Sequence, residues 1–438
     1  MRLLLRCDAG PSTGVGHAVR CAAIAEAAVA AGHHVLWSGR LDGLEWLWDG
    51  LEHDRGTVLD PADDARSLAA LARDVRADAV HVDHYGLGPE LRDALGPAGV
   101  ALSSVEDFHS GRRPADVVVD PNLGAADHPR PDDGSPVLLR GSAYAPLRAS
   151  VRRARDRRTM EPVHDTPRVL VVMGGTDAGG LLPHVVDALA ATGVPAAVDV
   201  VVPHGRSLDV PAGYRTVPPL PDLPGAAAGM DVVVSAAGTT VWELCCVGVP
   251  MALVRVADNQ IEGYRAVTGS GVAAGLGTAA DLPGPDTTAT LRHLLTDPET
   301  RDALAARARD VVDGRGAERV LDALRAATGA HRTLTTRPAT TADADMLLAW
   351  RNDPETRRWS RTPAPVHAVE HRAWLERSLA SGDRMLLVVE DACGPVGTVR
   401  WDRGPHGWEV SITVAPERRG AGLAGPVLAA AERALRES

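Results

Sequence analysis

The residues most suited to chemistry lie in a glycine loop near the N-terminus. Gly14, Gly16 and His17 follow the apolar run Leu3-Leu4-Leu5 and precede an alanine-rich stretch. Glycines in such a loop let backbone N–H groups approach a ligand, and the start of the next helix favours an anion. A neutral histidine is the commonest general base near pH 7. The pattern therefore indicates an anion-binding loop that carries a general base. The alternative is a tight turn with a capping histidine.

Two further loops of small and hydroxyl residues occur later in the chain. The first loop contains Gly174, Gly175 and Thr176. The second contains Gly238 and Thr239, and the acidic Glu243 follows it. Both loops precede apparent helices. Small residues let a diphosphate reach a helix N-terminus, and a carboxylate one turn further accepts hydrogen bonds from ribose hydroxyls. For Glu243 alone, a helix cap followed by an exposed acid is the simpler interpretation. As a set, the loops favour a nucleotide-diphosphate site.

A metal site is the alternative for His81, Asp83 and His84. Successive strand residues point to opposite faces, so His81 and Asp83 share a face while His84 lies at the strand end. Catalytic zinc usually has three protein ligands. We therefore predict no metal ligand in this region.

The elements that position these loops form βαβ units. Apolar runs at 34–37, 79–83, 117–120 and 168–173 alternate with helical stretches, the first of them at about 18–31. Alternation of this kind predicts parallel sheets with ligands at the carboxyl ends of the strands. We expect two similar α/β lobes, residues 1–150 and 165–328, separated by Pro- and Gly-rich and charged segments.

The pattern changes after residue 333. Strands are predicted at 334–339, 385–390, 397–402 and 408–414, with helices at 343–352 and 370–379. Short glycine turns between the later strands indicate an antiparallel sheet. Residues 333–438 are thus expected to form a third, different domain.

Composition excludes several classes of protein. The chain of 438 residues is 45% hydrophobic and 24% charged, as expected for globular domains. No apolar stretch reaches membrane-spanning length and no secretory signal is recognisable, so we expect a cytoplasmic protein. The net charge of −11 argues against nonspecific nucleic-acid binding. Five cysteines without zinc spacing are expected to be reduced, and mostly buried.

The motifs resemble one hydrolase family in their order and spacing. They run from Arg6-x-Asp8 and Gly14-x-Gly16-His17-x2-Arg20-Cys21 through Asp83-His84-Tyr85-Gly86, residues 141–148 and 173–177, to Asp258-Asn259-Gln260. This set is similar to that of the UDP-2,4-diacetamido-2,4,6-trideoxy-β-L-altropyranose hydrolases of pseudaminic acid biosynthesis. That family is similar in fold to the GT-B glycosyltransferase MurG. Over residues 1–328 the resemblance implies an inverting, metal-independent enzyme without a cofactor that releases UDP from a nucleotide sugar.

The resemblance also implies roles for particular residues. His17 corresponds to the catalytic histidine that activates water, Tyr85 lines the cleft, and Glu243 binds ribose. The remaining implied substrate-binding residues belong to the motifs and loops above: Asp8, Gly14, Gly16, Gly174, Gly175, Thr176, Gly238, Thr239, Asn259 and Gln260. One departure is Ser104-Val105-Glu106-Asp107, where many members carry paired aspartates, which leaves the sugar specificity open.

The third domain resembles the GNAT N-acetyltransferases. Arg419, Gly420, Gly422 and Ala424 fit their pyrophosphate loop, which binds acetyl-CoA through backbone N–H groups; an ordinary helix start is the alternative. Residues 347–354 are similar to the branch that acetylates sugars and ribosomal proteins. The family continues beyond the helix that ends near Ser438, so this α+β domain is expected to be incomplete at its C-terminus and to bind acetyl-CoA weakly.

Three hypotheses follow for the activity. In the first, the lobes hydrolyse a UDP-sugar. In the second, they transfer the sugar to an alcohol, since His17 can deprotonate water or an alcohol alike. In the third, they only bind the sugar nucleotide for an attached acetyltransferase. The intact His17 loop and Glu243 argue against the third. The exact sugar and the oligomeric state are not encoded in these patterns.

Overall fold

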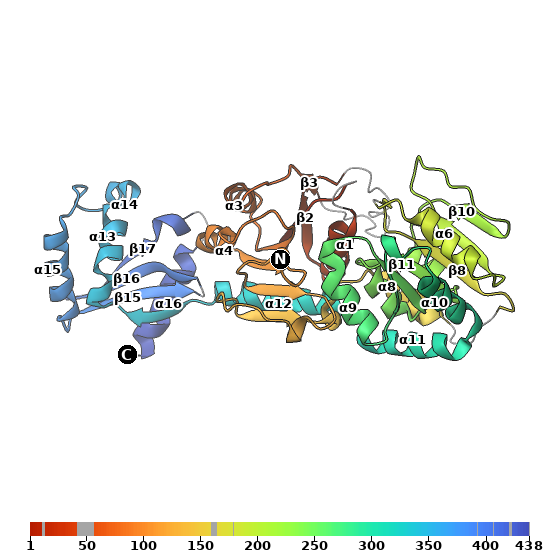
Figure 1. Ribbon diagram of the computed structural model, residues 1–438. Coiled ribbons are helices and arrows are strands. Elements are labelled where there is room, and N and C mark those ends of the chain that lie inside the picture. Colours follow the sequence, from red (N-terminus) through yellow and green to blue (C-terminus); the bar gives the residue numbers. More distant parts are fainter. Residues whose placement is uncertain are drawn as a thin grey trace. The chain divides into compact units, whose positions relative to one another are not determined.

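The computed structural model describes residues 1–10, 14–41, 57–158, 164–177, 179–391, 393–405, 407–419 and 423–437 (Figure 1). Residues 1–92 and 102–324 belong to one compact unit, and residues 93–101 and 325–438 belong to a second. Among the described residues no helix combines the length and apolarity needed to cross a membrane.

The first lobe is a parallel sheet of seven strands in the order β3-β2-β1-β4-β5-β6-β7. Its elements are β1 (Arg2–Cys7), α1 (Gly16–Ala30), β2 (His34–Ser38), β3 (Thr57–Leu59), α3 (Ala65–Asp74), β4 (Ala79–Asp83), α4 (Leu91–Leu95), β5 (Ala101–Val105), β6 (Val117–Asp120) and β7 (Val137–Arg140). β4, β5 and β6 are buried along their whole length, which explains their apolar composition.

The second lobe is a parallel sheet of six strands in the order β10-β9-β8-β11-β12-β13. Its elements are β8 (Arg168–Val172), α6 (Leu182–Ala191), β9 (Ala197–Val201), β10 (Tyr214–Val217), α7 (Leu223–Ala227), β11 (Val232–Ala236), α8 (Thr240–Val247), β12 (Met251–Arg255), α9 (Ile261–Gly269), β13 (Ala274–Thr278), α10 (Pro285–Thr296) and α11 (Pro298–Val311). α5 (Ala149–Arg157) packs against α7 and α8 of this lobe, and α12 (Gly316–Arg332) follows α11 in the chain. Apolar cores lie on both faces of the sheet.

Both sheets change direction at a defined pair of strands. In the first lobe the strand order reverses between β1 and β4, and in the second between β8 and β11. Open α/β sheets bind ligands beyond the carboxyl ends of the strands at such a reversal. The topology therefore places the ligand site at the loops that follow β1, β4, β8 and β11, where the three glycine loops of the sequence lie.

The C-terminal domain has an antiparallel sheet in the order β14-β15-β16-β17. Its elements are β14 (Thr335–Pro338), α13 (Ala344–Asn352), α14 (Pro354–Arg358), α15 (Ala368–Leu379), β15 (Arg384–Asp391), β16 (Gly394–Gly404), β17 (Gly407–Val414) and α16 (Ala424–Glu437). α13 and α15 share one apolar core with the sheet, while α16 contributes to a second core (Figure 1).

Candidate active site

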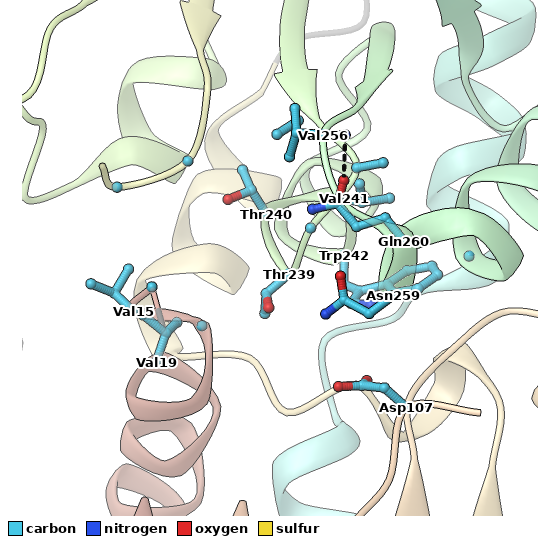
Figure 2. Close-up of a pocket in the computed structure, with 18 of the residues that line it drawn as sticks. Val15, Val19, Asp107, Thr239, Thr240, Val241, Trp242, Val256, Asn259 and Gln260 are labelled. Atoms are coloured by element: carbon cyan, nitrogen blue, oxygen red, sulfur yellow. Dashed lines mark hydrogen bonds between the residues drawn. The ribbon is translucent and has the colours of Figure 1, made fainter. Parts of the chain in front are cut away.

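A cavity of about 290 Å³ lies at the strand ends of the first unit. Loops after β1, β4 and β5 line it from the first lobe, and loops after β8, β11 and β12 line it from the second. In Figure 2, Thr239 and Asn259 of the second lobe and Val15, Val19 and Asp107 of the first border the same space. The lining includes all the residues assigned to the hydrolase site except Asp8: Gly14, Gly16, His17, Tyr85, Gly174, Gly175, Thr176, Gly238, Thr239, Glu243, Asn259 and Gln260.

The N-termini of two helices meet at this cavity. α1 begins at Gly16 and α8 begins at Thr240, directly after Thr239. A Cβ atom on Gly16 would lie 2.6 Å from the Oγ1 atom of Thr239, so a larger residue would require the Thr239 hydroxyl to move. Free backbone N–H groups at a helix start attract anions, and two such ends favour a diphosphate.

Backbone groups matter here because the cavity offers little free positive charge. Among its described lining residues, Arg20 is the only arginine or lysine, while Asp107, Asp177 and Glu243 are acidic. The guanidinium of Arg20 is engaged by two aspartates, as described below. A bound diphosphate would therefore rely on N–H groups rather than on a side-chain cation.

His17 is held by a buried carboxylate. Its Nδ1 atom lies 2.5 Å from Oδ1 of Asp83, the last residue of β4, whose side chain is fully buried. Arg20 approaches the same Nδ1 atom at 3.2 Å, but it also donates to Asp83 at 2.7 and 2.8 Å. The shorter contact and the negative charge of Asp83 favour a proton on Nδ1 that is donated to Asp83. Nε2 of His17 is then the nitrogen left to accept a proton from a ligand.

Asp83 stays ionised in this setting. Burial acts to raise its pKa, but Arg20 and His17 outweigh burial and hold the pKa far below the usual range of a carboxyl group. An ionised partner fixes the tautomer and orientation of an imidazole and stabilises the imidazolium that forms when it accepts a proton. The pair thus has the chemistry of an oriented general base.

A second carboxylate completes the network around Arg20. Asp107 accepts hydrogen bonds from Arg20 at 3.0 and 3.1 Å, from Asn122 at 3.1 Å and from the hydroxyl of Tyr85. Burial and the charge of Asp107 raise the pKa of Tyr85 well above its usual range, so the phenol stays protonated and donates. The Tyr85 ring stands edge-on to that of His17, with centroids 4.7 Å apart. Tyr85 therefore packs against the base and is fixed by Asp107.

The departure from the paired aspartates falls on a residue that does not line the cavity. Glu106 is 1% exposed and lies 3.0 Å from Arg130 and 3.9 Å from Arg112. Asp107, at the second position of the pair, keeps its carboxylate in the cavity. The cavity thus retains the carboxylate of Asp107, although the neighbouring position carries Glu106.

Glu243 lies in the first turn of α8 and is 5% exposed. Its Oε1 atom is 3.7 Å from Arg148 and accepts no hydrogen bond from the described residues. Burial raises the pKa of this carboxyl group, and Arg148 opposes the change. A buried acceptor without a hydrogen bond at a cavity wall suits a ligand hydroxyl. The simpler interpretation, in which Glu243 is an exposed acid after a helix cap, is therefore wrong about its exposure.

Asn259 and Gln260 lie in a short 3-10 helix, Asp258–Gln260, that precedes α9. The side chain of Gln260 accepts a hydrogen bond from the backbone N–H of Val256 at 2.9 Å, drawn as the dashed line in Figure 2. The amide of Asn259 points toward the side of the cavity that carries Asp107 (Figure 2). Gln260 thus shapes the loop, and Asn259 offers a polar group to a ligand.

Asp8 does not line the cavity. Its carboxylate accepts hydrogen bonds from Arg6 at 2.6 Å and from the backbone of Arg40 at 3.0 Å, and it lies 3.1 Å from Nε2 of His84. Burial acts to raise the pKa of Asp8, but these partners, Arg6 foremost, lower it to about 2. In the structure Asp8 thus takes part in ion pairs beside the loop after β1, and a contact with substrate stays a prediction.

The three residues of the metal alternative point to different partners. Nδ1 of His81 lies 3.0 Å from Ser103, Asp83 binds His17 and Arg20, and His84 faces Asp8. Within the part of the chain that the structure describes, no three histidine, cysteine or acidic side chains gather as a metal site. Asp83 therefore acts in this structure as the partner of His17 rather than in a ligand set.

Sequence reasoning overlooked the roles of Asp83, Arg20 and Asp107. Each belonged to a motif, but none was assigned to the site. The available signal was position: Asp83 ends a strand next to β1, and Arg20 lies one turn after His17 on α1, so both face the same strand end.

The residues assigned to acetyl-CoA are only partly described. Gly420 and Gly422 lie outside the described residues. Arg419 lies 2.6 Å from Asp353 and 3.3 Å from Glu355, and Ala424 begins α16. Arg419 also borders a cavity of about 750 Å³ in this domain, whose walls include Trp350, Trp359 and Trp374. The guanidinium of Arg419 is thus engaged by acidic residues, and acetyl-CoA binding by this loop stays a prediction.

Comparisons with known proteins divide the chain in the same way. Residues 333–437 match the family model described as "Acetyltransferase (GNAT) domain". This part is a GNAT-like domain. The chain is also 25% identical over 199 residues to the spore coat polysaccharide biosynthesis protein SpsG of Bacillus subtilis (strain 168). That match covers 43% of this chain and only 58% of the length of SpsG.

Solved structures show the fold of the part that precedes the GNAT-like domain. MurG of Acinetobacter baumannii is 18% identical with a TM-score of 0.54, and covers 74% of this chain and 99% of its own. UDP-GlcNAc 2-epimerase of Neisseria meningitidis, solved with UDP-GlcNAc bound, is 13% identical with a TM-score of 0.51, and covers 74% and 100%. The chain therefore combines two Rossmann-like lobes in a GT-B arrangement with a GNAT-like domain, as the sequence predicts.

Proposed function

We propose that the two lobes hydrolyse a UDP-linked 2,4-diacetamido-2,4,6-trideoxy sugar to UDP and the free sugar, with inversion, as in nonulosonate biosynthesis of the pseudaminic acid type. The observation that carries the proposal is the 2.5 Å contact between His17 and Asp83 at the wall of a cavity that two helix N-termini also reach. This contact orients a general base beside the two helix N-termini, which are suited to binding a diphosphate.

The proposed chemistry uses residues on both sides of the cavity. Nε2 of His17 accepts a proton from water as the water oxygen bonds to the anomeric carbon. The bond between that carbon and the phosphate oxygen breaks, and UDP leaves with the bonding electrons. Backbone N–H groups near Gly16 and Thr239 stabilise the charge on the departing diphosphate. Glu243 accepts hydrogen bonds from ribose hydroxyls, and Asn259 contacts the sugar.

The SpsG match supports a role in polysaccharide biosynthesis, because that is what the name of SpsG describes. Transfer of the sugar to an acceptor alcohol is the competing activity, because the GT-B glycosyltransferase MurG has the same fold. The deciding test is incubation with UDP-2,4-diacetamido-2,4,6-trideoxy-β-L-altropyranose without any acceptor, followed by NMR at the anomeric proton. Stoichiometric free sugar of inverted configuration supports hydrolysis, and turnover that requires an added alcohol supports transfer.

Acetyl transfer from acetyl-CoA to an amino sugar is a second candidate function, and the family match of residues 333–437 favours it. Calorimetric titration of the full chain with acetyl-CoA tests it. Micromolar binding with transfer to an amino-sugar nucleotide supports an active domain. If neither binding nor transfer is observed, the result supports a domain without acetyltransferase activity in this chain.

A further inference from the structure

We infer that His109 and His128 form a binding site for a transition-metal ion of the zinc or nickel type, separate from the catalytic network. The Nε2 atoms of the two rings face each other at 2.9 Å. The ring centroids are 4.6 Å apart, and the planes cross at 68°. The histidines come from different loops, one after β5 and one after β6, so the fold itself brings them together.

The geometry of the pair is close to that of two ligands on one ion. Zinc binds imidazole nitrogen at about 2.0–2.1 Å, so two nitrogens of a tetrahedral site are about 3.3 Å apart. The observed separation is a few tenths of an ångström shorter, a change that small ring rotations supply. One ring now carries the Nε2 proton of the hydrogen bond. When an ion binds, that proton moves to Nδ1, and both Nε2 lone pairs then reach the metal without net proton release.

Arginine side chains brace the backbone of the two loops that carry the rings. Arg112 donates to the carbonyl of Phe108 at 2.7 Å, and Arg140 donates to the carbonyl of His128 at 2.5 Å. A metal ion binds the neutral imidazole, whose unprotonated ring nitrogen keeps its lone pair. His109 is exposed and His128 half-buried, so water can occupy the remaining coordination positions.

The site adjoins the cleft through one aromatic residue. The Phe108 ring lies edge-on to His128, with centroids 5.2 Å apart, and it also lines the cavity. Asp107, the residue before Phe108, binds Arg20 and Tyr85. An ion at the histidine pair would tie the loop that carries Asp107 to the loop after β6. The inference rests on the two imidazoles and does not depend on hydrolysis.

The test is metal binding by the full chain after removal of bound metals. Calorimetry with Zn²⁺ is compared for the wild type, His109→Gln, His128→Gln and the control His204→Gln, which changes another exposed histidine. Because the chain has 16 histidines, the comparison between variants decides. We expect each variant of the pair to weaken one zinc site at least about tenfold, the control to leave it unchanged, and Mg²⁺ to bind none of them there. Wild-type zinc affinity and stoichiometry in either variant of the pair would overturn the inference.

A second measurement covers variants that fail to fold. X-ray absorption of the wild type loaded with one equivalent of Zn²⁺ counts the imidazole ligands directly. Two imidazoles with oxygen ligands agree with the site, and fewer than two contradict it. UDP binding, measured in parallel, reports whether each variant keeps its cleft.

Discussion

Nδ1 of His17 and Oδ1 of Asp83 lie 2.5 Å apart, although 66 residues separate them in the chain. The contact exists because β1 and β4 are neighbours in the sheet: Asp83 ends β4, and His17 lies in the first turn of α1, after the loop that follows β1. The two residues therefore flank the point where the strand order reverses. This relationship turns a histidine in a glycine loop into an oriented base.

Asp83→Asn tests that orientation. An amide can donate to Nδ1 and so favour the wrong tautomer, and it lacks the charge that stabilises the imidazolium. We expect kcat to fall by about 10²- to 10⁴-fold while the affinity for UDP changes little. Steady-state kinetics and UDP calorimetry measure the two quantities. Asp63→Asn, at an exposed aspartate paired with Arg40, is the matched control. Near wild-type kcat in Asp83→Asn would show that the carboxylate is not needed.

His17→Ala removes the base itself. We expect hydrolysis to fall by about 10²- to 10⁴-fold, with UDP affinity retained because the backbone N–H groups that hold the diphosphate are unchanged by the substitution. Single-turnover measurements at saturating UDP-sugar report the chemical step. A variant that keeps more than about a third of the wild-type kcat is incompatible with general-base catalysis by His17.

Gly16→Ala tests the close approach of the two helix starts. The added Cβ would lie 2.6 Å from Oγ1 of Thr239 but 3.6 Å from its Cβ, so the clash depends on the hydroxyl. We expect Gly16→Ala to weaken UDP binding by about tenfold or more in the wild-type background and by much less in Thr239→Ala. Calorimetry on the four proteins of this cycle gives the coupling. Additive losses would mean that the two residues do not meet.

Asp120 predicts a dependence of stability on pH. Its side chain is fully buried, and burial raises its pKa to about 6, although Asn122 and the backbone of Phe108 donate to it. The folded state thus binds the proton more tightly than the unfolded state, whose carboxyl pKa is about 3.9. The free energy of unfolding should therefore fall as pH rises from about 4 to about 6, by about 3 kcal/mol from this group.

Asp120→Asn should remove that fall. Urea unfolding at pH 4 and pH 7 measures the difference for the wild type, for Asp120→Asn and for Asp127→Asn, which changes an exposed aspartate. The first variant is expected to gain relative stability at pH 7, and the second to follow the wild type. Parallel pH profiles for all three proteins would show that Asp120 does not titrate in this range.

The architecture could be predicted from the sequence where buried strands are rich in valine, a residue that favours strands. The predicted runs at 79–83 and 117–120 are β4 and β6, and the predicted helix at 18–31 is α1 within two residues. β5 was not predicted, because Ser103 and Ser104 interrupt its apolar run, although both are buried. β7 was missed because it is short and follows the Pro- and Gly-rich segment that was taken as a separator.

Less of the candidate site was accessible to sequence reasoning. Glycine loops can be recognised from local spacing, and the structure brings them to one cavity. The partnership of His17 with Asp83 depends on strand order, which spacing alone does not give. Asp8 shows the converse: it belongs to the motif of the first loop, yet Arg6 and Arg40 hold it outside the cavity.

The central claim is that His17, held by Asp83, activates water for attack on the anomeric carbon. Its most direct test is turnover of the UDP-sugar in H₂¹⁸O, with mass spectrometry of both products. We predict that the wild type places ¹⁸O in the free sugar and none in UDP, at a rate that falls in parallel in His17→Ala and Asp83→Asn. Label in the β-phosphate of UDP, or a rate unaffected by both substitutions, would contradict the account.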